Sequence, residues 1–158
     1  MFAFSKTAEE QIENILKKYP EEKKLSAILP LLTLTQRQEG YVSPEAMIEI
    51  GKRLDCSPAY VQSVCSFYTM YYTHPVGKHL ILFCHNISCQ LNGADDLLKY
   101  TEDKLNVKVG ETTEDKKFTL HREECLAACC GAPMMRVNDT YYENLTRERI
   151  DHILDSLD

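Results

Sequence analysis

The arrangement of the cysteines is the feature that most constrains this chain. Four of its seven cysteines form two pairs: Cys84 and Cys89 enclose four residues, Cys125 and Cys129 enclose three, and thirty-five residues separate the pairs. The total is odd, and the N-terminal residues MFAFSKTAEE lack the charged and apolar regions of a secretory signal. We therefore expect a cytosolic chain whose thiols serve metal or redox chemistry, not disulfides.

The sequence around both pairs has the pattern of a small α/β domain. His79–Cys84 (HLILFC) is a continuous apolar run of strand length, which is typical of a central strand buried on both faces. Beyond it we expect a helix over 93–105, strands over 107–109, 118–121 and 134–137, a hairpin through 138–142, and a closing helix from Thr146 with Leu145 and Ile150 as a hydrophobic staple. Each cysteine pair is then expected in a loop at the end of an element, and this element order is that of a thioredoxin-like fold.

The preceding residues predict helices with explicit start signals. Thr7 and Glu10 have the spacing of a capping box, and Ser43-Pro44 and Ser57-Pro58 each place a serine cap before a proline at the first helical position. We expect helices from Thr7, over 22–39 with a kink or break at Pro30 and an end at Gly40, over 44–54, and over 58–66. The inward-facing side chains of the first two should be Ile12, Ile15, Leu16, Leu25, Ile28, Leu29 and Leu32, with Leu31 as a further candidate.

Charge divides along the chain in the same way as the structural pattern. Residues 1–77 carry 8 basic and 9 acidic side chains and residues 78–158 carry 10 and 15, so the net charges are −1 and −5. We predict an α/β protein with an N-terminal helical domain over 1–77 and a thioredoxin-like domain over 78–158 that holds the site.

The acidic balance argues against a nucleic-acid partner. The longest apolar stretch, 25–34, has ten residues and is too short for direct membrane insertion, which takes about 20.

Two cysteine pairs on loops match what a two-iron cluster needs, because each tetrahedral iron takes two thiolates beside two bridging sulfides. Structural zinc on the same four thiolates is the alternative, although zinc sites most often use C-x2-C spacing, which neither pair has. A thiol–disulfide enzyme would need a C-x-x-C pair, which is absent. Near the cluster, negative charge favours a low reduction potential.

The remaining candidate groups indicate no second site. Cys56 and Cys65 are expected to pack as small hydrophobic residues, and Cys130 as a bystander of Cys129. His85 should lie in the surroundings of the site or in solvent, and His74, His79, His121 and His152 should be surface or locally hydrogen-bonded residues. No nucleotide-binding glycine motif or catalytic nucleophile motif is present, so we expect no substrate-converting site in this chain.

Several segments together resemble one family. They are Gln38–Val42, Val61–Tyr68 with Thr69-Met70-Tyr71, Cys84–Cys89 with Asn92-Gly93-Ala94, and Glu124–Cys129 with Ala132-Pro133-Met134. With these, the chain resembles the small 2Fe-2S subunit, the 24 kDa subunit, of NADH:quinone oxidoreductase (complex I). The resemblance implies a helical bundle followed by a thioredoxin-like ferredoxin domain, one 2Fe-2S cluster, Cys84 and Cys89 on one iron, and Cys125 and Cys129 on the other. Cys130 and Ala128 depart from the usual family pattern.

The same resemblance implies a role and a partner. The expected role is one-electron transfer with FMN of a flavoprotein subunit that also binds NADH, and the expected location is cytoplasmic, peripheral on the cytoplasmic side of the membrane through the complex. An equivalent component of an NAD-linked hydrogenase or formate dehydrogenase, or a zinc-stabilised binding module, remains an alternative. The aromatic segment with Phe67, Tyr68, Met70, Tyr71 and Tyr72 is expected either to dock the partner or to pack the bundle against the ferredoxin domain.

Overall fold

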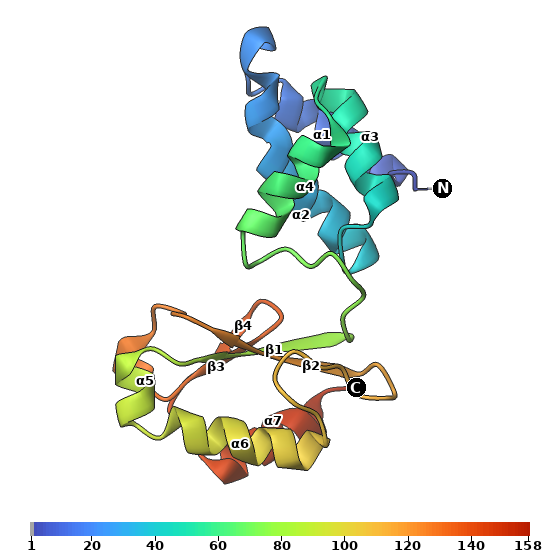
Figure 1. Cartoon of the computed structure of the whole chain (residues 1–158). Helices are drawn as coiled ribbons and strands as arrows, with labels where there is room; N and C mark the ends of the chain where they lie inside the picture. The colour runs from blue at the N-terminus through green and yellow to red at the C-terminus, as the bar shows by residue number, and fades with distance from the viewer. Residues whose placement is uncertain (1) are drawn as a thin grey trace. The chain divides into compact units, whose positions relative to one another are not determined.

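The computed structural model describes residues 2–158, which form two compact units (Figure 1). One unit extends to Pro75, and the other covers Val76–Asp158. The first is helical and the second is a mixed α/β sandwich. Within residues 2–158, no helix combines the length and the apolar character that crossing a bilayer requires.

The first unit is a bundle of four α-helices with one 3-10 segment. Its elements are α1 (Lys6–Leu16), η1 (Glu21–Ala27), α2 (Ile28–Glu39), α3 (Pro44–Leu54) and α4 (Pro58–Phe67). The two serine caps are confirmed, since Ser43 accepts a hydrogen bond from the Ala46 N–H and Ser57 from the Tyr60 N–H, both at 3.2 Å. Gly40 ends α2 in the left-handed conformation (φ 81°), which glycine adopts without strain.

Three expectations for this unit were wrong. The cap of α1 is Ser5, not Thr7, because Ser5 has extended backbone and accepts from the Ala8 N–H. The 22–39 segment does divide, into η1 and α2, but the break precedes Ile28 and is not at Pro30, which falls in the first turn of α2, where a missing N–H breaks no intrahelical bond. Leu25, expected inside, is 38% exposed because it lies on the short 3-10 segment.

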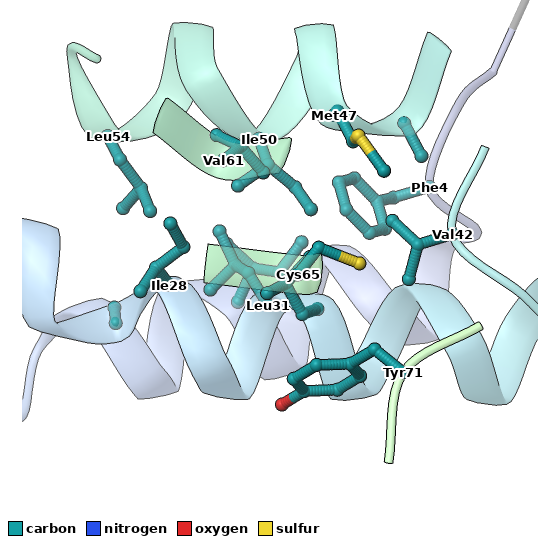
Figure 2. Close-up of a cluster of buried hydrophobic side chains, with 14 of the residues drawn as sticks. Phe4, Ile28, Leu31, Val42, Met47, Ile50, Leu54, Val61, Cys65 and Tyr71 are labelled. Carbon is teal, nitrogen blue, oxygen red and sulfur yellow. The ribbon is translucent and has the colours of Figure 1, made fainter. Parts of the chain in front are cut away.

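A single apolar core fills the bundle, and Figure 2 shows side chains from different helices meeting there. Leu31 and Leu32 of α2, Ile50 of α3 and Val61 of α4 are fully buried. Cys65 points into this core and is fully buried, as expected of a packing residue, and burial raises the pKa of its thiol.

The second unit is built on a four-stranded sheet with the order β2-β1-β3-β4. Its elements are β1 (His79–Cys84), α5 (Ile87–Leu91), α6 (Ala94–Leu105), β2 (Phe118–Glu123), η2 (Cys129–Gly131), β3 (Met135–Val137), β4 (Thr140–Tyr142) and α7 (Arg147–Ser156). Strand β1 pairs with β2 in parallel and with β3 antiparallel, and β3 and β4 form an antiparallel hairpin. β1 is thus the central strand that its continuous apolar run predicts.

The period-two alternation of β1 separates two clusters of buried side chains. Ile81 and Phe83 pack with Leu98 of α6 and Ile150 of α7, which lie together on one side of the sheet (Figure 1). Leu82 and Cys84 belong to a second, smaller cluster with Cys89, Ala94, Leu126 and Met134. The strand therefore directs its terminal cysteine away from the main core of this unit and towards the loops that follow the strands.

Most element predictions for the second unit are confirmed. The hairpin forms with Asn138 at φ 51°, and α7 begins after Thr146, whose hydroxyl accepts from the Arg149 N–H at 3.2 Å. Leu145 and Ile150, the predicted staple, are both buried. The strand over 107–109 was wrong, because left-handed Asn106 (φ 52°) ends α6 and the chain then turns towards Gly110. Val107 is nevertheless buried against the core.

Candidate metal centre

The first cysteine pair joins a strand end to a short helix. Cys84 is the last residue of β1, and Cys89 lies on α5, so the prediction that both lie in a loop was wrong for Cys89. The helix starts early because the Asn86 side chain caps it, accepting from the Ile87 N–H at 3.0 Å. Both thiols are buried, at 4% and 1% exposure.

Two of the four predicted thiols, those of Cys84 and Cys89, are hydrogen-bonded to each other, and Cys129 is near enough for its charge to act on Cys89. Burial, followed by a hydrogen bond with Cys84, raises the pKa of the Cys89 thiol to about 11, and the charges of Cys84 and Cys129 add to the same effect. A backbone hydrogen bond from Met134 acts in the opposite direction, because an N–H donor stabilises a thiolate. Cys89 therefore contacts the Cys84 side chain at the end of β1 and the backbone before β3.

The second pair lies at the same edge of the sheet. Since β1 and β2 run parallel with Cys84 opposite Glu123, the loop after β2 starts beside the end of β1. Cys125 lies in this loop and Cys129 begins η2, and both are exposed. Ala127, left-handed at φ 58°, directs its N–H to Cys125 Sγ at 3.4 Å. Within residues 2–158, Cys125 makes no hydrogen bond to the other three thiols, so its place beside them stays a prediction.

Contacts between the loops fix this edge. The His85 N–H donates to the Glu123 carbonyl at 3.1 Å, and the His85 ring Nε2 lies 3.2 Å from Glu124 Oε1. The Cys84 N–H donates to the Met134 carbonyl at 3.3 Å. His85 thus bridges the two cysteine loops, within the surroundings that the sequence indicates. His79, expected to be a surface or locally hydrogen-bonded residue, is buried, with Nε2 2.8 Å from the Asp158 carbonyl oxygen.

The chemistry of the donors suits a cluster held by cysteines. All seven cysteines are free thiols, a bound metal removes the thiol proton even where burial disfavours the anion, and backbone N–H groups of Met134 and Ala127 are directed at sulfurs. Within the part of the chain described, there is no group of three or more His, Cys, Asp or Glu side chains that could hold a metal ion. A two-iron cluster instead distributes its ligands over two irons.

Some residues of this edge were not singled out from sequence. Met134 was noted only as part of a motif, yet its N–H and carbonyl serve Cys89 and Cys84 respectively. Glu143, which follows β4, lies against Gly131 of η2. Neither carries a local sequence signal, because both contacts depend on strands that meet only in the folded sheet.

The fold and this edge define a class of protein: an α/β domain that presents paired thiols where two parallel strands end. A family model described as "Thioredoxin-like [2Fe-2S] ferredoxin" matches residues 12–158. The chain belongs to this family, which confirms the predicted fold class and the family resemblance.

Similar proteins carry consistent names. A subunit of the NADH-quinone oxidoreductase of Rickettsia conorii is 47% identical over 99% of this chain and 94% of its own length. NADH dehydrogenase [ubiquinone] flavoprotein 2, mitochondrial, of Dictyostelium discoideum is 40% identical over 99% of this chain and 64% of its own length. Among solved structures, an air-oxidised NAD+-reducing [NiFe]-hydrogenase superposes with a TM-score of 0.72 at 19% identity, over 80% of this chain and 22% of that one, which shows a shared fold.

Proposed function

We propose that this chain carries one 2Fe-2S cluster and transfers single electrons as a subunit of an NADH:quinone oxidoreductase. The observation that carries the proposal is the contact between Cys84 and Cys89 beside the loop that holds the second cysteine pair, in a chain of the 2Fe-2S ferredoxin family. Cys84 and Cys89 would hold one iron, and Cys125 and Cys129 the other. The bound cluster would supply one-electron redox chemistry without proton or group transfer at a substrate.

The protein's own contribution is position and environment. β1 and α5 keep Cys84 and Cys89 out of water, while the loop after β2 leaves Cys125 and Cys129 near the surface. This asymmetry places one ligand pair where a partner's redox group can approach. The N–H groups of Met134 and Ala127 stabilise thiolate charge and so tune the reduction potential.

The partner in this proposal is the flavoprotein subunit that binds FMN and NADH. NADH oxidation takes place there, and this chain receives or returns one electron at a time. The identities of 47% and 40% to oxidoreductase subunits favour this assembly over an NAD-linked hydrogenase, to which the 19% identical structure shows a shared fold. The complex would hold the chain at the cytoplasmic side of the membrane.

The test is reduction of the chain by NADH with and without the flavoprotein. Bleaching of the visible absorption and a reduced-state paramagnetic signal should follow NADH addition only when the FMN-loaded partner is present. Flavoprotein stripped of FMN is the matched control and should give no reduction. A cluster that NADH plus loaded partner leaves oxidised, although its measured midpoint potential lies at or above that of NADH, would refute the proposed electron exchange.

A further inference from the structure

Glu143 contacts the turn that contains Cys129. It follows β4 in the chain, yet its side chain lies across Gly131, the last residue of η2. A Cβ on Gly131 would overlap the Glu143 carboxylate and would lie 2.6 Å from Glu143 Cβ. The space that Glu143 occupies therefore exists only because residue 131 has no side chain.

Backbone hydrogen bonds on both sides hold this contact in place. The Asn144 N–H donates to the Gly131 carbonyl at 2.6 Å, and the Leu145 N–H donates to the Pro133 carbonyl at 2.9 Å. Leu145 is itself buried at 5% exposure and anchors the start of α7. The segment that carries Glu143 is thus fixed to the loop of the second cysteine pair.

The Glu143 carboxylate forms no ion pair within the part of the chain described. Within residues 2–158, Glu143 has no ion-pair partner and no side-chain hydrogen bond, whereas Glu124 pairs with His85 and Asp95 with Arg122. Glu143 is also half-buried, so water screens its charge less than that of a fully exposed side chain. Its field therefore acts on the adjoining turn.

Glu143 lies close to Cys129, a proposed cluster ligand, on the scale of electrostatic screening. A 3-10 turn rises about 2 Å per residue, which puts Gly131 about 4 Å along the axis from Cys129. Charges closer than about 8–10 Å interact appreciably at physiological ionic strength. Reduction adds a negative charge to a cluster, so a nearby carboxylate disfavours the reduced form.

We propose that Glu143 tunes the cluster, lowering its reduction potential through the negative charge that it holds against the Cys129 turn. This inference rests on the proposed function, because it requires a cluster on the four cysteines. Glu143 is not a ligand of the cluster. It acts electrostatically, from its position against the turn that holds Cys129, and so it is a positioning residue.

The test is a potentiometric titration of the purified, cluster-loaded full chain, followed by its visible and paramagnetic spectra. The variants Glu143→Asp, Glu143→Gln and Glu143→Lys change the charge in steps. Glu114→Gln is the matched control, because it removes one acidic charge before β2, at the opposite end of a strand about 20 Å long. Gly131→Ala provides an independent route, since its methyl group must displace Glu143.

The midpoint potential should rise from wild type through Glu143→Gln to Glu143→Lys. At an ambient potential equal to the wild-type midpoint, the reduced-to-oxidised ratio of Glu143→Gln should increase at least threefold. Glu143→Asp and Glu114→Gln should stay near wild type, and Gly131→Ala should shift upward.

The inference would be overturned if the midpoint potentials did not follow the charge at residue 143, or if Glu114→Gln shifted the potential by the same amount as Glu143→Gln. Either result would leave the proposed function intact. Loss of the cluster in Glu143→Gln but not in Glu143→Asp would also overturn it, because Glu143 would then serve assembly. A wild-type chain that takes up no cluster would instead refute the proposed function.

Discussion

Single cysteines should fall into two groups when they are replaced. Changing Cys84, Cys89, Cys125 or Cys129 to Ala removes one of four ligands, so each variant should lose or grossly alter the visible absorption and paramagnetic spectra of the cluster. Cys125→Ala is the sharpest case, because its thiol is exposed and hydrogen-bonds only to the Ala127 N–H within residues 2–158. A normal cluster spectrum in the Cys125→Ala variant would contradict the ligand assignment.

The other three cysteines supply the controls. Cys65→Ala and Cys56→Ala lie in the helical unit and should keep the wild-type spectrum, although Cys65 is fully buried and its loss should cost stability. Cys130→Ala is the closest match, since it changes the residue next to Cys129 without removing a proposed ligand. These spectra are compared at equal protein concentration.

Gly51 should resist a change that usually stabilises helices. Ala is better than Gly inside a helix by about 1 kcal/mol. A Cβ at Gly51 of α3, however, would lie 2.7 Å from the Cys56 carbonyl oxygen, a backbone atom. We expect Gly51→Ala to lower the free energy of unfolding by about 1–3 kcal/mol, as overpacking does. Denaturant titration checks this, with Lys52→Ala as control, and a more stable Gly51→Ala would contradict it.

At the residue scale, short-range signals were predictable and long-range contacts were not. The caps Ser43 and Ser57 depend on neighbours in sequence, and both are confirmed, whereas the cysteine pairs remain a prediction. The cap at Ser5 was missed because Thr7 offered an equally good local pattern. The roles of Met134 and Glu143 depend on residues far away in sequence, so no spacing indicates them.

Among the elements, an ion pair joins α1 to α3 and gives the helical unit a pH dependence. Arg53 donates to both oxygens of Glu9, at 2.6 and 2.7 Å, and to Glu49 at 2.9 Å. The hydrogen bond with Arg53 lowers the pKa of the Glu9 carboxyl. A carboxyl with a lowered pKa stabilises the folded state above its usual value of 4.5, and this stabilisation is lost as the pH falls through the lowered value.

Glu9→Gln should therefore be less stable than wild type at neutral pH and equally stable in acid. The difference should be at most about 1 kcal/mol, because the pair is partly exposed to water. Denaturant titrations at several pH values measure it, and Glu10→Gln, on the same helix without an ion pair in the described residues, is the control. A difference between wild type and Glu9→Gln that persists unchanged in acid would contradict the assignment.

Elements with a clear apolar pattern or a recognisable turn sequence could be predicted, and short irregular elements could not. β1 and the β3–β4 hairpin follow from an apolar run and a turn at Asn138. The helix α5 has five residues, too few to display a 3.6-residue pattern, so Cys89 was assigned to a loop. Val107 and Val109 alternate like a strand, but the end of α6 at Asn106 turns the chain away.

For the whole molecule, the aromatic segment that starts at the end of α4 contains both buried and exposed side chains. Tyr71 and Tyr72 are buried at 7%, whereas Phe67 is 78% and Met70 50% exposed. Two of the five side chains of the segment are thus buried, and we expect the exposed ones to contact the flavoprotein subunit. Exposed aromatic and Met side chains are enriched in protein interfaces.

The double variant Phe67→Ala with Met70→Ala should weaken binding to the flavoprotein about fivefold or more, since an interface anchor contributes upwards of about 1 kcal/mol. Its thermal stability and cluster spectrum should match wild type. Ile48→Ala, another exposed apolar residue of the bundle, should bind normally. Calorimetric titration against the partner provides the affinities, and unchanged binding of the double variant would remove this segment from the interface.

The central claim is that the four paired thiolates hold a 2Fe-2S cluster, and elemental analysis of the purified chain tests it most directly. Iron, acid-labile sulfide and zinc are measured on the same anaerobic sample. We predict about two iron and two sulfide per chain, visible colour, and a paramagnetic signal on reduction. A colourless chain with stoichiometric zinc and no sulfide would contradict the account and would indicate a zinc-stabilised binding module instead.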